Sequence, residues 1–71
     1  MASQTFLVSS AGGVWEFSLH KERFGPFRTR AEAMGQAVVA ASEAGRLSGH
    51  SRVMAVDESG RLYTAWTYSK G

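Results

Sequence analysis

The sequence predicts an α+β fold in which two β-hairpins form a four-stranded sheet with a single helix packed on one face (ββαββ). Three observations support it. One alanine-rich segment has a helical period and marks both of its ends, an alternating apolar and polar run precedes it, and two β-prone runs joined by a turn follow it. The chain of 71 residues is predicted to be one domain, residues 1–71, near the lower size limit for a single hydrophobic core.

The N-terminal part of the chain predicts the first hairpin. Residues 4–9 are apolar and rich in β-forming side chains, so they are expected to form a strand. The glycines at 12–13 permit the positive φ angles of a tight turn. In residues 14–20, apolar and polar side chains alternate as they do in a strand with one buried face. The apolar members are Trp15, Phe17 and Leu19.

Residues 21–28 are expected to be a loop or a broken extension of this strand, because they show no periodicity and contain the single proline of the chain. Pro26 also disfavours a helical conformation at Gly25. Phe24 and Phe27 would be unusual as fully solvated side chains. We therefore expect at least one of them to pack under the start of the helix.

Residues 29–45 predict the helix. Thr29 and Glu32 have the spacing of a capping box, in which the threonine hydroxyl accepts from a backbone N–H and the glutamate reaches back to the cap. Gly45 resembles a left-handed C-cap, which would let Leu47 fold back on the last turn. These signals predict both ends of the helix.

The apolar positions of this helix recur at three- and four-residue spacing and therefore form one stripe. They are Ala31, Met34, Ala37, Val38, Ala41 and Ala44. Because most are small, the helix is expected to lie close to a sheet. Gly35 costs about 1 kcal/mol relative to alanine in a helix interior, so we expect a bulky ring or another backbone to pack against it.

The C-terminal part predicts the second hairpin. Residues 46–51 are expected to be a polar connection, residues 52–56 a strand, residues 57–60 a type I turn, and residues 61–68 the last strand. Strict alternation divides the last strand into two faces. Leu62, Thr64, Trp66 and Tyr68 would share one face, with Tyr63, Ala65 and Thr67 on the other.

The order of these motifs resembles the small bacterial domains grouped as domain-of-unknown-function family 2188. The residues that carry the resemblance are Trp15 with Phe17, Thr29 with Glu32 and Ala33, Ala37 and Ala41, Met54 and Val56, Asp57 with Gly60 and Arg61, and Thr67 with Tyr68. The resemblance implies a ββαββ domain and gives no catalytic residues to assign.

Composition restricts the function classes. The chain has no cysteine, so it can form neither a disulfide nor a thiolate zinc site. No basic region precedes a long apolar run, and no stretch of 18 apolar residues occurs. We therefore expect a cytoplasmic protein that does not enter a membrane.

The case for an enzyme is weak, and we predict no catalytic residue, no metal and no cofactor. His20 and His50 have no carboxylate pair or cysteine at ligand spacing, which favours solvated surface histidines. An enzyme would require the fold to bring one of them close to Glu16 or Asp57 in a pocket.

A basic stretch between residues 20 and 30 is the first candidate site. Its four cations are opposed by a single acidic residue, Glu22, and two phenylalanines lie among them. Cations of this kind can contact phosphates while a ring stacks on a base. The candidate nucleic-acid contacts are Lys21, Arg23, Phe24, Phe27, Arg28 and Arg30. A solvated loop without a ligand is the other interpretation.

The aromatic last strand is the second candidate site. Tyr63, Trp66 and Tyr68 could form a protein interface or stack on single strands if one sheet face is uncovered. An unpaired edge strand could also pair with its copy in a homodimer. The other interpretation is core packing for Trp66 and ordinary half-exposed surface for the tyrosines.

Overall fold

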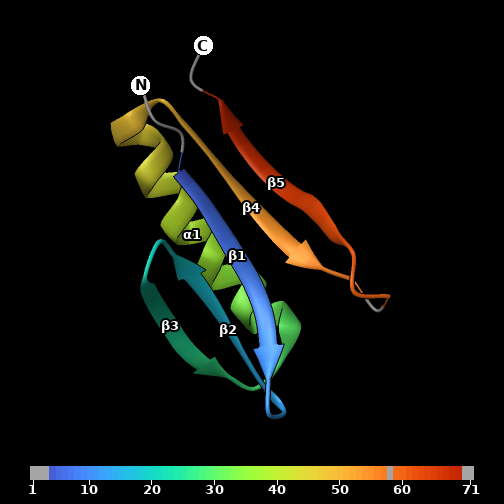
Figure 1. Cartoon of the computed structure of the whole chain (residues 1–71). Coiled ribbons are helices and arrows are strands. Elements are labelled where there is room, and N and C mark those ends of the chain that lie inside the picture. The colour runs from blue at the N-terminus through green and yellow to red at the C-terminus, as the bar shows by residue number, and fades with distance from the viewer. Residues whose placement is uncertain (1–3, 58, 70–71) are drawn as a thin grey trace.

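The computed structural model describes residues 4–57 and 59–69. Its elements are β1 (Gln4–Ala11), β2 (Val14–Leu19), β3 (Glu22–Phe27), α1 (Arg30–Ser48), β4 (His50–Val56) and β5 (Leu62–Ser69). The five strands form one mixed sheet in the order β3-β2-β1-β4-β5, and α1 lies across one face of it (Figure 1). Neighbouring strands are antiparallel except β1 and β4, which are parallel. The α+β class with one helix on one face is confirmed.

The predicted number of four strands is wrong, because residues 22–27 form a fifth strand at one edge of the sheet. β3 pairs with β2, and the register shifts between Trp15 and Phe17. This shift breaks the period of two that a strand normally shows in its sequence. Pro26 is tolerated here because an edge strand needs backbone hydrogen bonds on one side only.

The first hairpin is confirmed. β1 and β2 pair antiparallel, with Phe6 opposite Leu19 and Val8 opposite Phe17. Gly12 and Gly13 have φ angles of 60° and 84°, so both turn residues occupy the left-handed region that a two-residue hairpin turn requires.

The start of the helix is confirmed by its capping hydrogen bonds. The hydroxyl of Thr29 accepts from the backbone N–H of Glu32 at 3.1 Å. The carboxylate of Glu32 reaches back and accepts from the backbone N–H of Arg28, also at 3.1 Å. The reciprocal bond thus goes to the residue before the cap. Both bonds hold the chain as it passes from β3 into α1.

The predicted end of the helix is wrong. The helix continues through Gly45 and ends at Ser48, with Gly49 as a left-handed C-cap at φ 92°. The backbone N–H of Gly49 donates to the carbonyl of Gly45 at 2.7 Å. Leu47 is 87% exposed and does not fold back on the last turn. Gly45 and Gly49 are four residues apart and both resemble a C-cap in sequence. The helix ends at Gly49, because Gly45 packs closely against β4 and β5.

Gly45 is buried because β4 and β5 approach the helix closely at this point. A Cβ atom there would lie 2.5 Å from the ring of Tyr68 and 2.9 Å from the hydroxyl of Ser51. The expectation of close packing at Gly35 is wrong, since a Cβ atom at that position would meet nothing within 4 Å. The close approach therefore lies at the other glycine of the same helix.

The small-residue face of α1 is confirmed, with a shifted set of residues. The buried row repeats every four residues and consists of Ala33, Ala37, Ala41 and Gly45. Ala31 is exposed, contrary to the prediction, whereas Met34, Val38 and Ala44 are partly buried beside the row. The sheet side of the core is formed by Phe6, Val8, Phe17, Val53 and Ala55. Small side chains let the helix lie close to these strands.

The predicted division of the last strand into two faces is wrong, because β5 contains a bulge. Val53 pairs with Trp66, whereas the next residue of β4, Met54, pairs with Thr64. The extra residue, Ala65, restarts the alternation. Tyr63, Trp66 and Tyr68 consequently lie opposite the buried residues Ala55, Val53 and Ser51, on the helix side of the sheet.

All eight aromatic side chains of the chain are on the helix side. Phe6 and Phe17 are in the core, and Trp15, Phe27, Tyr63 and Trp66 pack against it. Phe24 stacks on Phe17 with ring centroids 4.9 Å apart, and Tyr68 lies against Gly45. The opposite face of the sheet therefore presents no aromatic ring.

The second hairpin is confirmed in the residues that the structure describes, which leave out residue 58. The backbone N–H of Gly60 donates to the carbonyl of Asp57 at 3.0 Å, as in a β-turn. One carboxylate oxygen of Asp57 accepts from the backbone N–H of Ser59 at 2.8 Å, from the Ser59 hydroxyl at 2.7 Å and from the backbone N–H of Arg61 at 2.9 Å. These bonds lower the pKa of Asp57, the Ser59 hydroxyl most.

This carboxylate makes the stability of the hairpin depend on pH. A lowered folded-state pKa means that the stabilisation is complete above the pKa of the unfolded chain, at about pH 4, and is lost as the pH falls through the folded-state pKa. We expect the difference in stability between the wild type and Asp57→Asn to be constant above about pH 5 and to shrink below about pH 4. Urea unfolding at several pH values measures it. A difference that stays the same down to the most acid pH would contradict this assignment.

Candidate functional site

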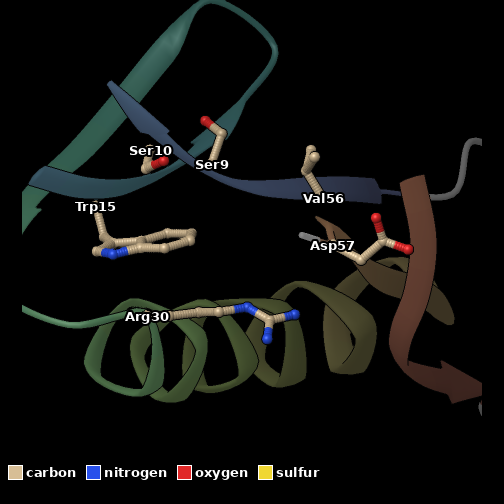
Figure 2. Close-up of a pocket in the computed structure, with 6 residues that line it drawn as sticks. All are labelled: Ser9, Ser10, Trp15, Arg30, Val56 and Asp57. Atoms are coloured by element: carbon tan, nitrogen blue, oxygen red, sulfur yellow. The ribbon is translucent and has the colours of Figure 1, made fainter. Parts of the chain in front are cut away.

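A cavity of about 430 Å³ opens between the helix and the sheet at one end of the fold. Its lining residues are Ser9, Ser10, Trp15, Arg30, Val56 and Asp57 (Figure 2). Its volume falls within the range of small-molecule sites in proteins. We call it the end cavity.

The chain directions bring these residues together. β1 and β4 are parallel, so Ser10 and Asp57, at or just beyond their carboxyl ends, lie at the same edge of the sheet. β2 begins just after the tight turn, which places Trp15 there as well, and Arg30 is the first residue of α1. The carboxyl edge of parallel strands is a frequent ligand position in α/β sheets, and this fold has one such pair.

Trp15 forms the sheet side of the end cavity. It is half-buried and pairs with Ser10 on one neighbouring strand and Phe27 on the other. In Figure 2 its indole extends from the sheet toward the helix, above the side chain of Arg30. The indole thus combines packing against the core with a surface that faces the cavity.

Arg30 forms the helix side. Its guanidinium carbon lies 5.5 Å from the centroid of the Tyr63 ring, a cation–π contact. The Nε atom is buried and has no hydrogen-bond partner among the described residues. Buried donors normally have a partner, so the hydrogen-bonding capacity of this nitrogen is unused within the described residues.

Asp57 closes the far side of the end cavity, and the hydrogen bonds from Ser59 and Arg61 hold the pKa of its carboxyl group below the usual value. One of its oxygens is occupied by the turn, as described above. Arg30 and Asp57 also line an adjoining hollow of about 450 Å³, together with Ser59 and Tyr63. They form no ion pair with each other. A ligand here would therefore meet a cation and an anion on different sides.

Family models, curated proteins and solved structures contain no match to this chain. The resemblance to family 2188 stays a prediction.

The structure divides the predicted basic site between different parts of the molecule. Arg28 and Arg30 lie beside the end cavity, where β3 passes into α1. Lys21 is in the turn at the other end of β3, and a strand of six residues is about 20 Å long. Arg23 points to the open face of the sheet, 3.5 Å from the Glu16 carboxylate. Two of the four cations therefore share a location.

The two phenylalanines of that stretch pack against the protein itself. Both stack on Phe17, with centroid distances of 4.9 Å for Phe24 and 5.9 Å for Phe27. Phe24 is 39% exposed at the rim of this stack, and Phe27 is half-buried. Neither ring lines the end cavity.

The second candidate site, the aromatic side chains of β5, is half-buried. The rings of Trp66 and Tyr68 lie 6.3 Å apart, Tyr68 packs against the helix at Gly45, and Tyr63 lies under the guanidinium of Arg30. These rings are on the helix side of an edge strand and so do not form an uncovered platform.

The histidines lie away from the carboxylates. His50 and Asp57 are at opposite ends of β4, and His20 is in the turn between β2 and β3. Within residues 4–57 and 59–69, no group of three or more His, Asp or Glu side chains could hold a metal ion. In the same residues, the helix α1 is not long and apolar enough to cross a membrane.

Sequence reasoning identified Arg30 and missed the rest of the end cavity. The sequence placed Trp15 in the core, and it placed Asp57 in a turn or, for an enzyme, beside a histidine. Their meeting depends on β1 and β4 being parallel neighbours, which no local pattern indicates. Their positions in the sequence were the available signal. Trp15 is the second residue of a strand that follows a tight turn, and Asp57 directly follows another strand.

Proposed function

We propose that the protein is a small non-enzymatic binding module that associates weakly with nucleic acid through the end of the fold that carries Arg28, Arg30 and the end cavity. The observation that supports this proposal best is that Arg30 and Trp15 line one cavity. A guanidinium suits a phosphate and an indole face suits a base, so the two chemical parts of a nucleotide have neighbouring partners.

The charge distribution supports weak binding. Arg28 and Arg30 can neutralise about two phosphates, which for a single strand gives a slope of about −1.4 in log affinity against log salt concentration. If Lys21 and Arg23 also contributed, four phosphates would give a slope of about −2.8. The salt dependence therefore tells the two footprints apart.

Fluorescence anisotropy with short labelled DNA and RNA at low salt tests the proposal, with a pair of charge reversals as the decisive comparison. Arg28→Glu and Lys21→Glu both replace an exposed cation, and both change the net charge by the same amount. Arg28→Glu is expected to weaken binding roughly fivefold, corresponding to about 1 kcal/mol of lost attraction, because it lies beside the end cavity. Lys21→Glu, at the other end of β3, should leave the affinity nearly unchanged.

Two results would count against the proposal. One is the absence of binding to any of the oligonucleotides at high micromolar protein. The other is an equal effect of the two reversals, because equal effects would mean that the net charge and not this end of the fold attracts the nucleic acid.

Self-association is the alternative function, and the difference between the two sheet edges favours it. β3 carries Glu22, Arg23 and Pro26, which discourage strand pairing, whereas β5 contains neither a charge nor a proline. Antiparallel pairing of β5 with a second copy would place no like charges together. Light scattering over a dilution series tests for self-association. A strict monomer at high concentration would exclude this alternative.

A further inference from the structure

We infer that the end cavity accepts a single unpaired nucleotide, with its base on Trp15 and its phosphate on Arg30, so that the module prefers single strands to duplexes. This inference rests on the proposed function and names the form of nucleic acid that the site recognises.

The positions of the aromatic rings limit where a base can stack. All eight rings are on the helix side, so the open face of the sheet gives no stacking platform of the kind that many sheet proteins use for RNA. Phe6 and Phe17 are buried, at 3% and 5% exposure. Trp15 is the aromatic residue that lines the end cavity. A base that stacks on Trp15 must therefore enter the cavity.

The size of the end cavity fits one nucleotide. Its volume of about 430 Å³ suits a single small ligand, and it lies between one helix and one sheet. A base inside a duplex is covered on both faces by its neighbours, so it cannot reach the indole without leaving the stack, which costs a few kcal/mol. An unpaired base avoids most of this cost.

The polar groups fit the rest of a nucleotide. Arg30 lines the end cavity, and its guanidinium can donate to phosphate oxygens. The carboxylate of Asp57 can accept from a sugar hydroxyl or a base amino group and would repel phosphate. These opposite preferences place the phosphate toward Arg30 and the donor groups toward Asp57.

Tryptophan fluorescence tests the inference directly. The chain has two tryptophans, so Trp66→Phe leaves Trp15 as the single reporter. We expect quenching by a 5′-mononucleotide and by an unpaired oligonucleotide, and none by inorganic phosphate or ribose 5-phosphate, which lack a base. The single strand should bind roughly fivefold or more tightly than a blunt duplex of the same sequence, which is the smallest effect expected of one stacked base.

Two variants test whether Trp15 and Arg30 are responsible for nucleotide binding and for the preference for single strands. Trp15→Leu should remove most of the preference for single strands, because it should weaken single-strand binding more than duplex binding. Because Trp15 also packs against the core, its fold is checked by circular dichroism. Arg30→Gln removes the cation on the helix side of the end cavity. This variant should weaken mononucleotide binding.

The outcomes separate the two levels of the proposal. If single strand and duplex bind equally, if Trp15 is not quenched, or if Trp15→Leu folds and keeps the preference, the inference is overturned while a charge-dependent affinity at Arg28 can still stand. If no oligonucleotide binds at all, the proposed function fails and the inference fails with it.

Discussion

Replacing Phe17 with alanine is expected to lower the free energy of unfolding by about 3–5 kcal/mol, the usual cost of deleting a buried aromatic side chain. Phe17 is 5% exposed and contacts Phe6 on β1 and both phenylalanines of β3. It therefore connects β1, β2 and β3 beneath the helix. A domain of this size has roughly 4–10 kcal/mol of stability in total, so the substitution should remove about a third or more of it and lower the unfolding midpoint strongly.

Phe24→Ala is the matched control, because it removes the same side chain from the exposed rim of the same stack. Phe24 is 39% exposed, and its loss should cost about 1 kcal/mol. Urea unfolding followed by circular dichroism measures both variants. Equal midpoints for the two would show that Phe17 is not the centre of the core.

Gly45→Ala is expected to destabilise the protein, against the usual effect of this substitution in a helix. Alanine normally gains about 1 kcal/mol over glycine in a helix interior. Here the new Cβ atom would lie 2.5 Å from the ring of Tyr68, so the helix and β5 would have to separate. Overpacking of this kind costs about 1–3 kcal/mol, so after the gain in helix propensity we expect a net loss of up to about 2 kcal/mol.

Gly35→Ala in the same helix provides the control. A Cβ atom there meets nothing within 4 Å, so this variant should gain about 0.5–1 kcal/mol. Thermal unfolding of both variants measures the opposite signs. A stabilising effect of both substitutions would mean that β5 does not pack against α1 at Gly45.

Local signals predicted the parts of the fold that local chemistry determines. The glycine pair after β1, the capping residue Thr29 and the turn at Asp57 each require a particular residue type at one position, and each was recognised. The alternation of Trp15 and Phe17 also placed the buried face of β2. These features depend on residues at most four positions apart.

The errors arose where contacts between distant segments override the local pattern. Gly45 resembles a C-cap in sequence, but it lies inside the helix, where a residue without a side chain leaves room for the ring of Tyr68. β3 was not recognised as a strand because a register shift and Pro26 remove its periodicity. The bulge at Ala65 moves Tyr63 to the same face as Trp66. No window of a few residues contains the information for these features.

The candidate site was predicted for Arg30 and, beside it, Arg28, since a cation cluster is visible in the sequence. The end cavity could not be predicted, because Trp15 of β2, Arg30 of α1 and Asp57, which follows β4, meet through the parallel pairing of β1 with β4. Strand order is a property of the whole chain, and the two hairpins alone do not determine it.

The claim that the end cavity binds a nucleotide is tested most directly by titrating the labelled protein with a short unpaired oligonucleotide and recording ¹H–¹⁵N correlation spectra. The two indole N–H signals serve as internal reporters, because Trp15 lines the end cavity and Trp66 does not. We expect the Trp15 indole and the amides around Arg30 and Asp57 to shift together with one affinity, while Trp66 stays in place. Shifts confined to Lys21, Arg23 and the open face of the sheet, with the Trp15 signal unmoved, would contradict the account.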